Sequence, residues 1–166
     1  DLQSDMSSPS VVTPPVTERV LTVQFRELAG FDVVHYGLWF ERIREEFPQF
    51  TRQRRLPPII EQFPEGPQRR QFQVGLEWGV PRGRSVFASG GEEAQRLQQL
   101  QPDRFAMNWR RDPRSQDYLG FTETRRRFAE WFEKFGEFCV QQRLPEPVVE
   151  ICEVIYVNHI GVPKGE

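Results

Sequence analysis

A cysteine and a histidine near the end of the chain are the residue types from which a nucleophile and its general base are built. Cys152 and His159 both fall in an apolar stretch that is typical of a β-strand. At ~3.3 Å per residue their separation is roughly 23 Å, and an odd spacing places the two side chains on opposite faces of the strand. They therefore cannot act together in one chain. A small buried cysteine and a histidine at the strand end are expected instead.

The remaining cysteine and histidine add no chemistry to this pair. Cys139 and Cys152 are the only two cysteines and lack the close spacing of metal ligands, although they could approach each other across a helix–sheet interface. His35 lies far from both in the sequence. The sequence thus predicts no catalytic residue, no cofactor and no metal site. An enzyme is not indicated.

Arginine and asparagine residues on one predicted strand form a more suggestive group. Alternation places Arg104, Asn108 and Arg110 on one face and Trp109 on the other. Cationic and polar side chains on an exposed sheet face could bind phosphates or nucleic-acid bases. The alternative is a solvated face, or ion pairs with nearby acidic residues. A basic run in a preceding loop would extend this surface, with the residues Arg52, Arg54 and Arg55.

The last predicted strand is apolar on both faces over a run of four residues. The run consists of Val154, Ile155, Tyr156 and Val157. A strand of this kind is either covered on both sides or pairs with a partner. We therefore interpret these four residues as a candidate interface, in a homodimer or with a larger protein partner.

Alternating and helical apolar patterns divide the chain into elements that would position these side chains. In chain order we expect strand Val20–Phe25, a helix capped by Asp32 and ended by Pro48, strand Gln71–Trp78, strand Arg84–Ser89, a hairpin of Arg96–Gln101 and Arg104–Arg111, a helix from the N-cap Thr122 to Arg143, and strand Val148–Ile160. Residues 48–67, which contain five prolines, are predicted to be a long loop.

The order β-α-β-β-β-β-α-β predicts an α+β domain in which an antiparallel sheet packs on the second helix. That helix carries a continuous aromatic stripe, made of Phe128, Trp131, Phe132, Phe135, Phe138 and Cys139. The layout is similar to TATA-binding-protein-like and helix-grip architectures. We expect a segment at 1–17 that is disordered or tag-derived, followed by one domain at 18–166.

Bulk composition narrows the classes of function. With 14 Phe and 4 Trp among 166 residues, the chain can bury a large apolar core although its hydrophobic content is only 37%. The net charge of −2 gives no global attraction to nucleic acids or anionic membranes. No apolar run approaches a membrane span, and no signal peptide is recognisable, so a cytoplasmic location is expected.

Three segments resemble a sporadically distributed prokaryotic family of uncharacterised proteins. They are Leu100–Phe105, Asn108–Arg110 and Cys152–Ile160, which follow the pattern QPDRFxxNWR and then CEVxYxNHI. Members of that family usually carry a second portion after this strand, so the resemblance implies that the chain is an N-terminal portion. It implies no activity and no site residue.

Three functions remain open from the sequence. The first is a non-catalytic interaction or ligand-binding module, which the doubly apolar strand favours. The second is a nucleic-acid-binding domain that uses the Arg/Asn/Trp sheet face. The third is an enzyme or small-ligand receptor with a cavity between helix and sheet.

Overall fold

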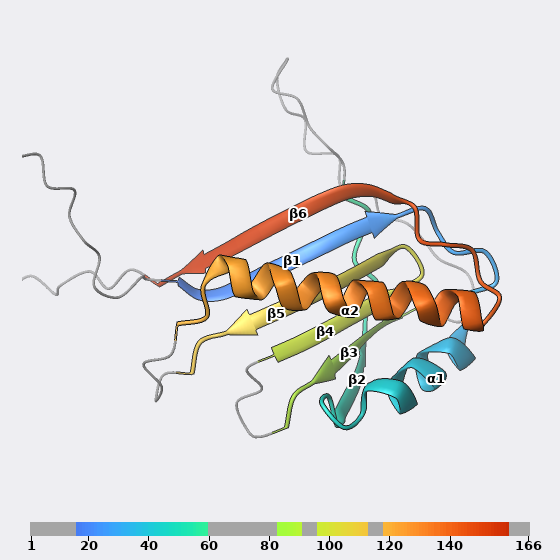
Figure 1. The fold of residues 1–166 in the computed structure, drawn as a ribbon, viewed down its shortest axis with the longest axis horizontal. Coiled ribbons are helices and arrows are strands. Elements are labelled where there is room, and N and C mark those ends of the chain that lie inside the picture. The colour runs from blue at the N-terminus through green and yellow to red at the C-terminus, as the bar shows by residue number, and fades with distance from the viewer. Residues whose placement is uncertain (1–15, 60–82, 91–95, 113–117, 160–166) are drawn as a thin grey trace, which may run out of the picture.

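The computed structural model describes residues 16–59, 83–90, 96–112 and 118–159 (Figure 1). These ranges contain six strands and two helices. In chain order they are β1 (Val16–Phe25), α1 (Val33–Ile43), β2 (Gln49–Gln53), β3 (Arg84–Ala88), β4 (Arg96–Gln101), β5 (Arg104–Arg110), α2 (Phe121–Gln141) and β6 (Val149–Asn158).

The strands form one sheet in the order β2-β3-β4-β5-β1-β6, and every neighbouring pair is antiparallel. Both helices lie on the same face of this sheet, with α2 crossing in front of the central strands and α1 beside it (Figure 1). We refer to this side as the helix face and to the opposite side as the far face. The α+β class and the packing of the sheet on the late helix are confirmed.

Aromatic rings fill the space between the helices and the sheet. Trp39 of α1 is fully buried, and its ring contacts those of Phe135 and Phe138 in α2 at centroid distances of 5.5 and 5.3 Å. Phe105 of β5 stacks on Phe135 at 5.5 Å. Large rings remove much apolar area from water per residue, which explains how a chain with modest hydrophobic content forms a core. The predicted stripe of α2 indeed faces this core.

The first helix begins where its sequence predicts. Asp32 accepts a hydrogen bond from the Val34 amide at 3.0 Å, and His35 Nδ1 accepts one from the Asp32 amide at 3.1 Å. This reciprocal cap satisfies two amides that have no partner inside the helix. The helix ends at Ile43 rather than at Pro48, and Phe47 is buried in the turn that follows.

The second helix begins two residues earlier than predicted and without a side-chain cap. Its N-cap is Gly120 rather than Thr122, and Thr124 donates its hydroxyl back to the Gly120 carbonyl at 3.1 Å. It ends at Gln141, two residues before the predicted Arg143. Two of the three arginines in its first turns are paired, since Glu123 contacts Arg126 and Arg127 at 2.7 Å.

The described elements include one strand that was not predicted. β2 lies inside the stretch at 48–67 that was predicted to be a loop, so that prediction is wrong for Gln49–Gln53. Its Phe50 packs on Phe87 of β3 at 5.5 Å, which ties the segment to the sheet. The predicted strand Gln71–Trp78 lies outside the described residues. β1 begins at Val16, so two residues of the predicted 1–17 segment belong to the sheet.

Candidate functional site

The predicted Arg/Asn surface lies on the far face, but two of its three members are buried. Arg104 and Asn108 are 6% and 7% exposed, whereas Arg110 is exposed. Trp109 lies on the opposite, helix face, as predicted, because β5 alternates and Phe105 and Met107 point into the core. Other residues of the far face are also buried, namely Thr22, Gln24, Val86, Leu97 and Ala106. Arg104 and Asn108 therefore do not form an exposed platform.

Polar side chains on this far face join the strands in a ladder. Arg84 donates to Gln53 and, at 2.6 Å, to Gln99. Gln99 then donates to Asn108 at 2.6 Å. Glu18 completes the ladder on β1, accepting hydrogen bonds from Asn108 at 2.6 Å and Arg110 at 3.2 Å. Asn108 and Arg110 thus link neighbouring strands through Glu18 and Gln99.

The segment 54–59, which leaves β2, crosses the far face and covers Arg104. Arg104 donates to the Pro57 carbonyl at 2.6 Å and to Gln24 at 3.1 Å. Gln24 in turn accepts from the Ile59 amide at 2.6 Å. Gln101 bonds both the amide and the carbonyl of Leu56. These contacts replace strand pairing with side-chain-to-backbone bonds, so the segment lies flat on the sheet.

Of the three loop arginines, Arg55 lies near Arg104, and its charge contributes to the lowered pKa of Arg104. Arg52 of β2 lies opposite Ser85 of β3. This position is two residues from the Phe50–Phe87 pair, so the Arg52 side chain lies on the helix face, as Phe87 does. Arg54 is exposed. Arg55 forms ion pairs with Asp103 at 2.7 Å and Glu27 at 3.0 Å. The predicted basic surface is thus divided between two faces and partly neutralised.

Burial sets the electrostatics of the far face. It lowers the pKa of Arg84 and of Arg104, and the pKa of Arg84 is lowered further by the nearby charge of Arg104. Both guanidinium groups stay protonated at any physiological pH. For Arg104 the carboxylates of Asp103 and Glu153 oppose this effect. The far face therefore carries one buried and one half-buried arginine, whose charges are compensated by acidic neighbours and neutral amides. This arrangement holds the strands together rather than forming a binding site.

A fully buried arginine that the sequence analysis missed lies on the helix face. Arg19 of β1 is 0% exposed and donates to Thr124 Oγ1 at 2.7 Å, to the Leu119 carbonyl at 3.0 Å and to Tyr118 Oη at 2.6 Å. Within the described residues these acceptors are all neutral. Four aromatic rings lie within 6 Å of its guanidinium carbon, those of Trp109, Tyr118, Phe121 and Tyr156.

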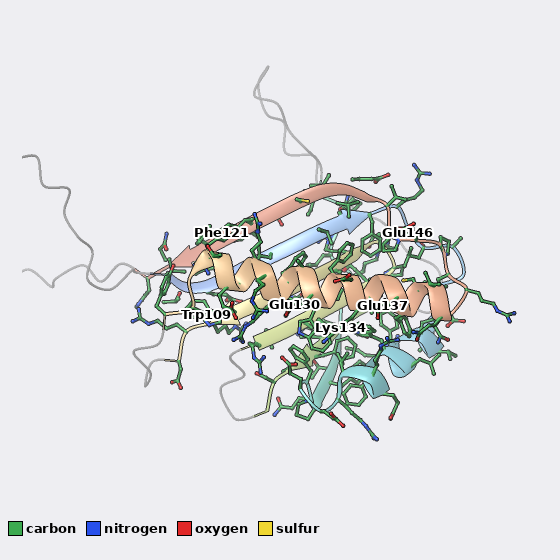
Figure 2. All side chains as sticks on the ribbon, in the orientation of Figure 1. Trp109, Phe121, Glu130, Lys134, Glu137 and Glu146 are labelled. Carbon is green, nitrogen blue, oxygen red and sulfur yellow. The ribbon has the colours of Figure 1, made fainter. Side chains whose placement is uncertain are left out.

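The Arg19 cage fastens the start of α2 to the sheet. Trp109 and Phe121, labelled in Figure 2, both lie at the end of the molecule where α2 begins. Cation–π contacts and hydrogen bonds to neutral acceptors replace the hydration of the buried charge. A sequence signal for this role exists, because Arg19, Leu21, Val23 and Phe25 share one face of β1 by alternation. Starting the predicted strand at Val20 hid it.

The candidate interface strand β6 lies at one edge of the sheet. Its only neighbour among the described strands is β1. The four apolar residues predicted to form an interface are exposed by 44% (Val154), 42% (Ile155), 45% (Tyr156) and 43% (Val157). Val154 pairs opposite Leu21 and Tyr156 opposite Arg19, which places them on the helix face, while Ile155 and Val157 lie on the far face. An apolar strand edge is thus open to solvent on both faces.

The two cysteines occupy contrasting surroundings and are not bonded to each other. Cys139 in α2 is buried, and burial raises the pKa of its thiol to about 12. Cys152 in β6 is exposed. His159 follows the end of β6, and His35 belongs to the cap of α1. Within the described ranges, no group of three or more His, Cys, Asp or Glu side chains is placed to hold a metal ion.

Comparison of the chain with protein-family models, with curated proteins and with solved structures gives no match. Neither described helix is long and apolar enough to cross a membrane.

Proposed function

We propose that this domain is a non-catalytic interaction module that binds an extended polypeptide segment by adding it as a further strand beside β6. The observation that supports this proposal is the exposure of Val154–Val157 on both faces of an edge strand. An edge offers a row of backbone donors and acceptors to an incoming strand. Apolar side chains above and below that row add affinity, because pairing removes them from water.

The length and composition of β6 also support the proposal. Proteins usually guard edge strands with charged residues, proline, a bulge, a short length or a covering segment. β6 is ten residues long and contains neither proline nor lysine, and its two charged residues, Glu150 and Glu153, both precede the apolar run Val154–Val157. The opposite edge, β2, follows the usual pattern, because it is five residues long and four of them are polar. Of the two edges formed by the described strands, β6 is therefore the one suited to bind an apolar strand.

The geometry favours this function over the two alternatives from the sequence. Nucleic-acid binding was argued from an exposed cationic face, whereas Arg104 and Asn108 are buried and engaged within the sheet. A ligand cavity was expected between helix and sheet, where the described residues pack ring against ring.

A peptide selection tests the proposed function. Random peptides of about ten residues, the length of β6, are displayed and selected on the immobilised domain. We expect the enriched peptides to alternate apolar residues, and we expect Ile155→Lys to weaken their binding by about tenfold or more, because a charge at the edge opposes pairing.

The matched control is Leu38→Lys, which places the same charge at an equally exposed apolar position on α1. It should leave peptide affinity unchanged. Enrichment of peptides that bind both variants equally, or no enrichment at all, would contradict the proposal.

A further inference from the structure

We infer that the strand bound by β6 is β6 of a second copy of this chain, paired antiparallel about a twofold axis at Tyr156. The inference rests on the proposed function, since it names the occupant of the β6 edge. The result would be a continuous sheet that runs through both copies, with all four helices on one side, because such an axis is perpendicular to the sheet.

Self-pairing is favoured by the difference between the two edges of the sheet. A strand that is apolar on both faces is best matched by another of the same kind, and among the described strands β6 alone exposes apolar residues on both faces. Pairing β6 with the polar β2 of another copy would leave its apolar residues opposite Gln, Thr and Arg. It would also generate an open filament, whereas β6–β6 pairing closes as a dimer.

Backbone orientation agrees with an axis at Tyr156. The Val157 carbonyl is directed toward β1, where it accepts a hydrogen bond from Thr17 Oγ1 at 3.1 Å. Successive residues of a strand direct their N–H and C=O groups to opposite sides. Tyr156 therefore directs both groups toward the open edge, and across a twofold axis the two Tyr156 residues can exchange a pair of hydrogen bonds.

Charge is compatible with the same axis. The charged residues of β6 are Glu150 and Glu153, and His159 follows the end of the strand. An axis at Tyr156 places Glu153 of each copy opposite His159 of the other. An axis at Glu153 would instead place two carboxylates opposite each other, which is unfavourable.

The resulting pairs bury the exposed apolar run on both faces. Ile155 of each copy lies opposite Val157 of the other on the far face, and the two Tyr156 residues meet on the helix face. Each Tyr156 ring is held in place by Arg19, whose guanidinium carbon lies 5.0 Å from the ring centroid. An aromatic side chain that is already ordered loses less entropy when it pairs.

Sedimentation equilibrium of the unaltered chain gives the first test. We expect a concentration-dependent mass approaching twice 19.6 kDa. Ile155→Lys should shift the association at least about tenfold toward monomer, while the control Leu38→Lys should not.

Disulfide cross-linking tests the register. In a Cys152→Ser background, Tyr156→Cys should oxidise rapidly to a covalent dimer, because directly opposite residues lie ~5.5 Å apart between Cα atoms. The control Val154→Cys, in the same background, lies opposite Asn158 instead. Its two copies would be separated by about four residues, or ~13 Å, which is too far for a disulfide.

The outcomes separate the two proposals. A chain that stays monomeric at all concentrations, or that cross-links through Val154→Cys and not through Tyr156→Cys, overturns the inference. If that monomer still binds selected peptides through β6, the proposed function stands without it. A chain that neither dimerises nor selects peptides removes both.

Discussion

Arg19 combines complete burial with a guanidinium charge. Its guanidinium connects β1 to Thr124 and Tyr118 near the start of α2. Its Nε makes no hydrogen bond within the described structure, so the site is held by two terminal nitrogens and by ring contacts. A planar, forked donor suits this arrangement, because one side chain reaches three acceptors at once.

Arg19→Ala is expected to destabilise the domain by about 3 kcal/mol. The substitution leaves buried polar atoms without partners and removes ring contacts. Arg19→Lys should recover only part of the loss, because an ammonium group cannot reproduce the fork. Urea unfolding measures both. Arg26→Ala serves as control, because its side chain is 79% exposed and its ion pair with Glu150 is long, at 3.7 Å. An effect of Arg19→Ala as small as that of the control would contradict this role.

At the level of single residues, the sequence predicted correctly which side chains of β5 share a face. It did not predict which of them would be covered by another segment of the chain. Alternation correctly placed Trp109 on the other face of β5 from Arg104 and Asn108, because this pattern follows from strand geometry alone. It could not show that segment 54–59 crosses over Arg104, since that contact joins residues 47 positions apart. Whether a polar face is exposed depends on the tertiary structure, which local patterns do not contain.

At the scale of elements, α2 provides most of the aromatic contacts that hold the helices on the sheet. Phe135 is fully buried and its ring contacts those of Phe25, Trp39 and Phe105, from two strands and the other helix. One side chain thus links both layers and both helices.

Phe135→Ala is expected to lower the free energy of unfolding by about 3–5 kcal/mol, the typical range for removing a buried aromatic ring. Val140→Ala on the same helix, at a position 69% exposed, should change it by less than ~0.5 kcal/mol. Thermal or urea unfolding compares the two. If both variants lost similar stability, the cost would come from helix propensity rather than from packing.

The elements that sequence patterns predicted well are those with strong periodicity or a cap. The Asp32 cap and the aromatic stripe of α2 are examples. β2 was missed because Gln49–Gln53 is polar and is preceded by Pro48, a composition typical of a loop. It becomes a strand because Phe50 packs on Phe40 and Phe87, which is a tertiary effect.

On the scale of the whole molecule, stability at high pH should depend on two buried groups, one from each helix. Burial raises the pKa of Cys139 from 9.0 to about 12 and that of Tyr36 from 10.0 to about 12. Tyr36 also donates its hydroxyl to the Gly83 carbonyl at 2.9 Å. Both groups therefore stay protonated in the folded state at pH values where the unfolded chain begins to lose these protons.

We expect the free energy of unfolding to fall between pH 9 and pH 12. A raised pKa in the folded state gives a contribution that is complete below the unfolded pKa and is lost as the pH rises through the folded value. The slope should be roughly 1 kcal/mol per pH unit for each group. Tyr36→Phe should flatten the decline above pH 10. A pH-independent urea midpoint over this interval would contradict the assignment.

The pairing of β1 with β6 also bears on how the domain is made on the ribosome. β1 is synthesised before the other described elements, yet its two neighbours in the sheet are β5 and β6, so its pairing is complete only after β6 has been made. The described sheet therefore cannot be finished during synthesis until β6 has left the exit tunnel. The proximity of β1 and β6 also permits circular permutation, in which a short linker joins these two strands and new termini open elsewhere.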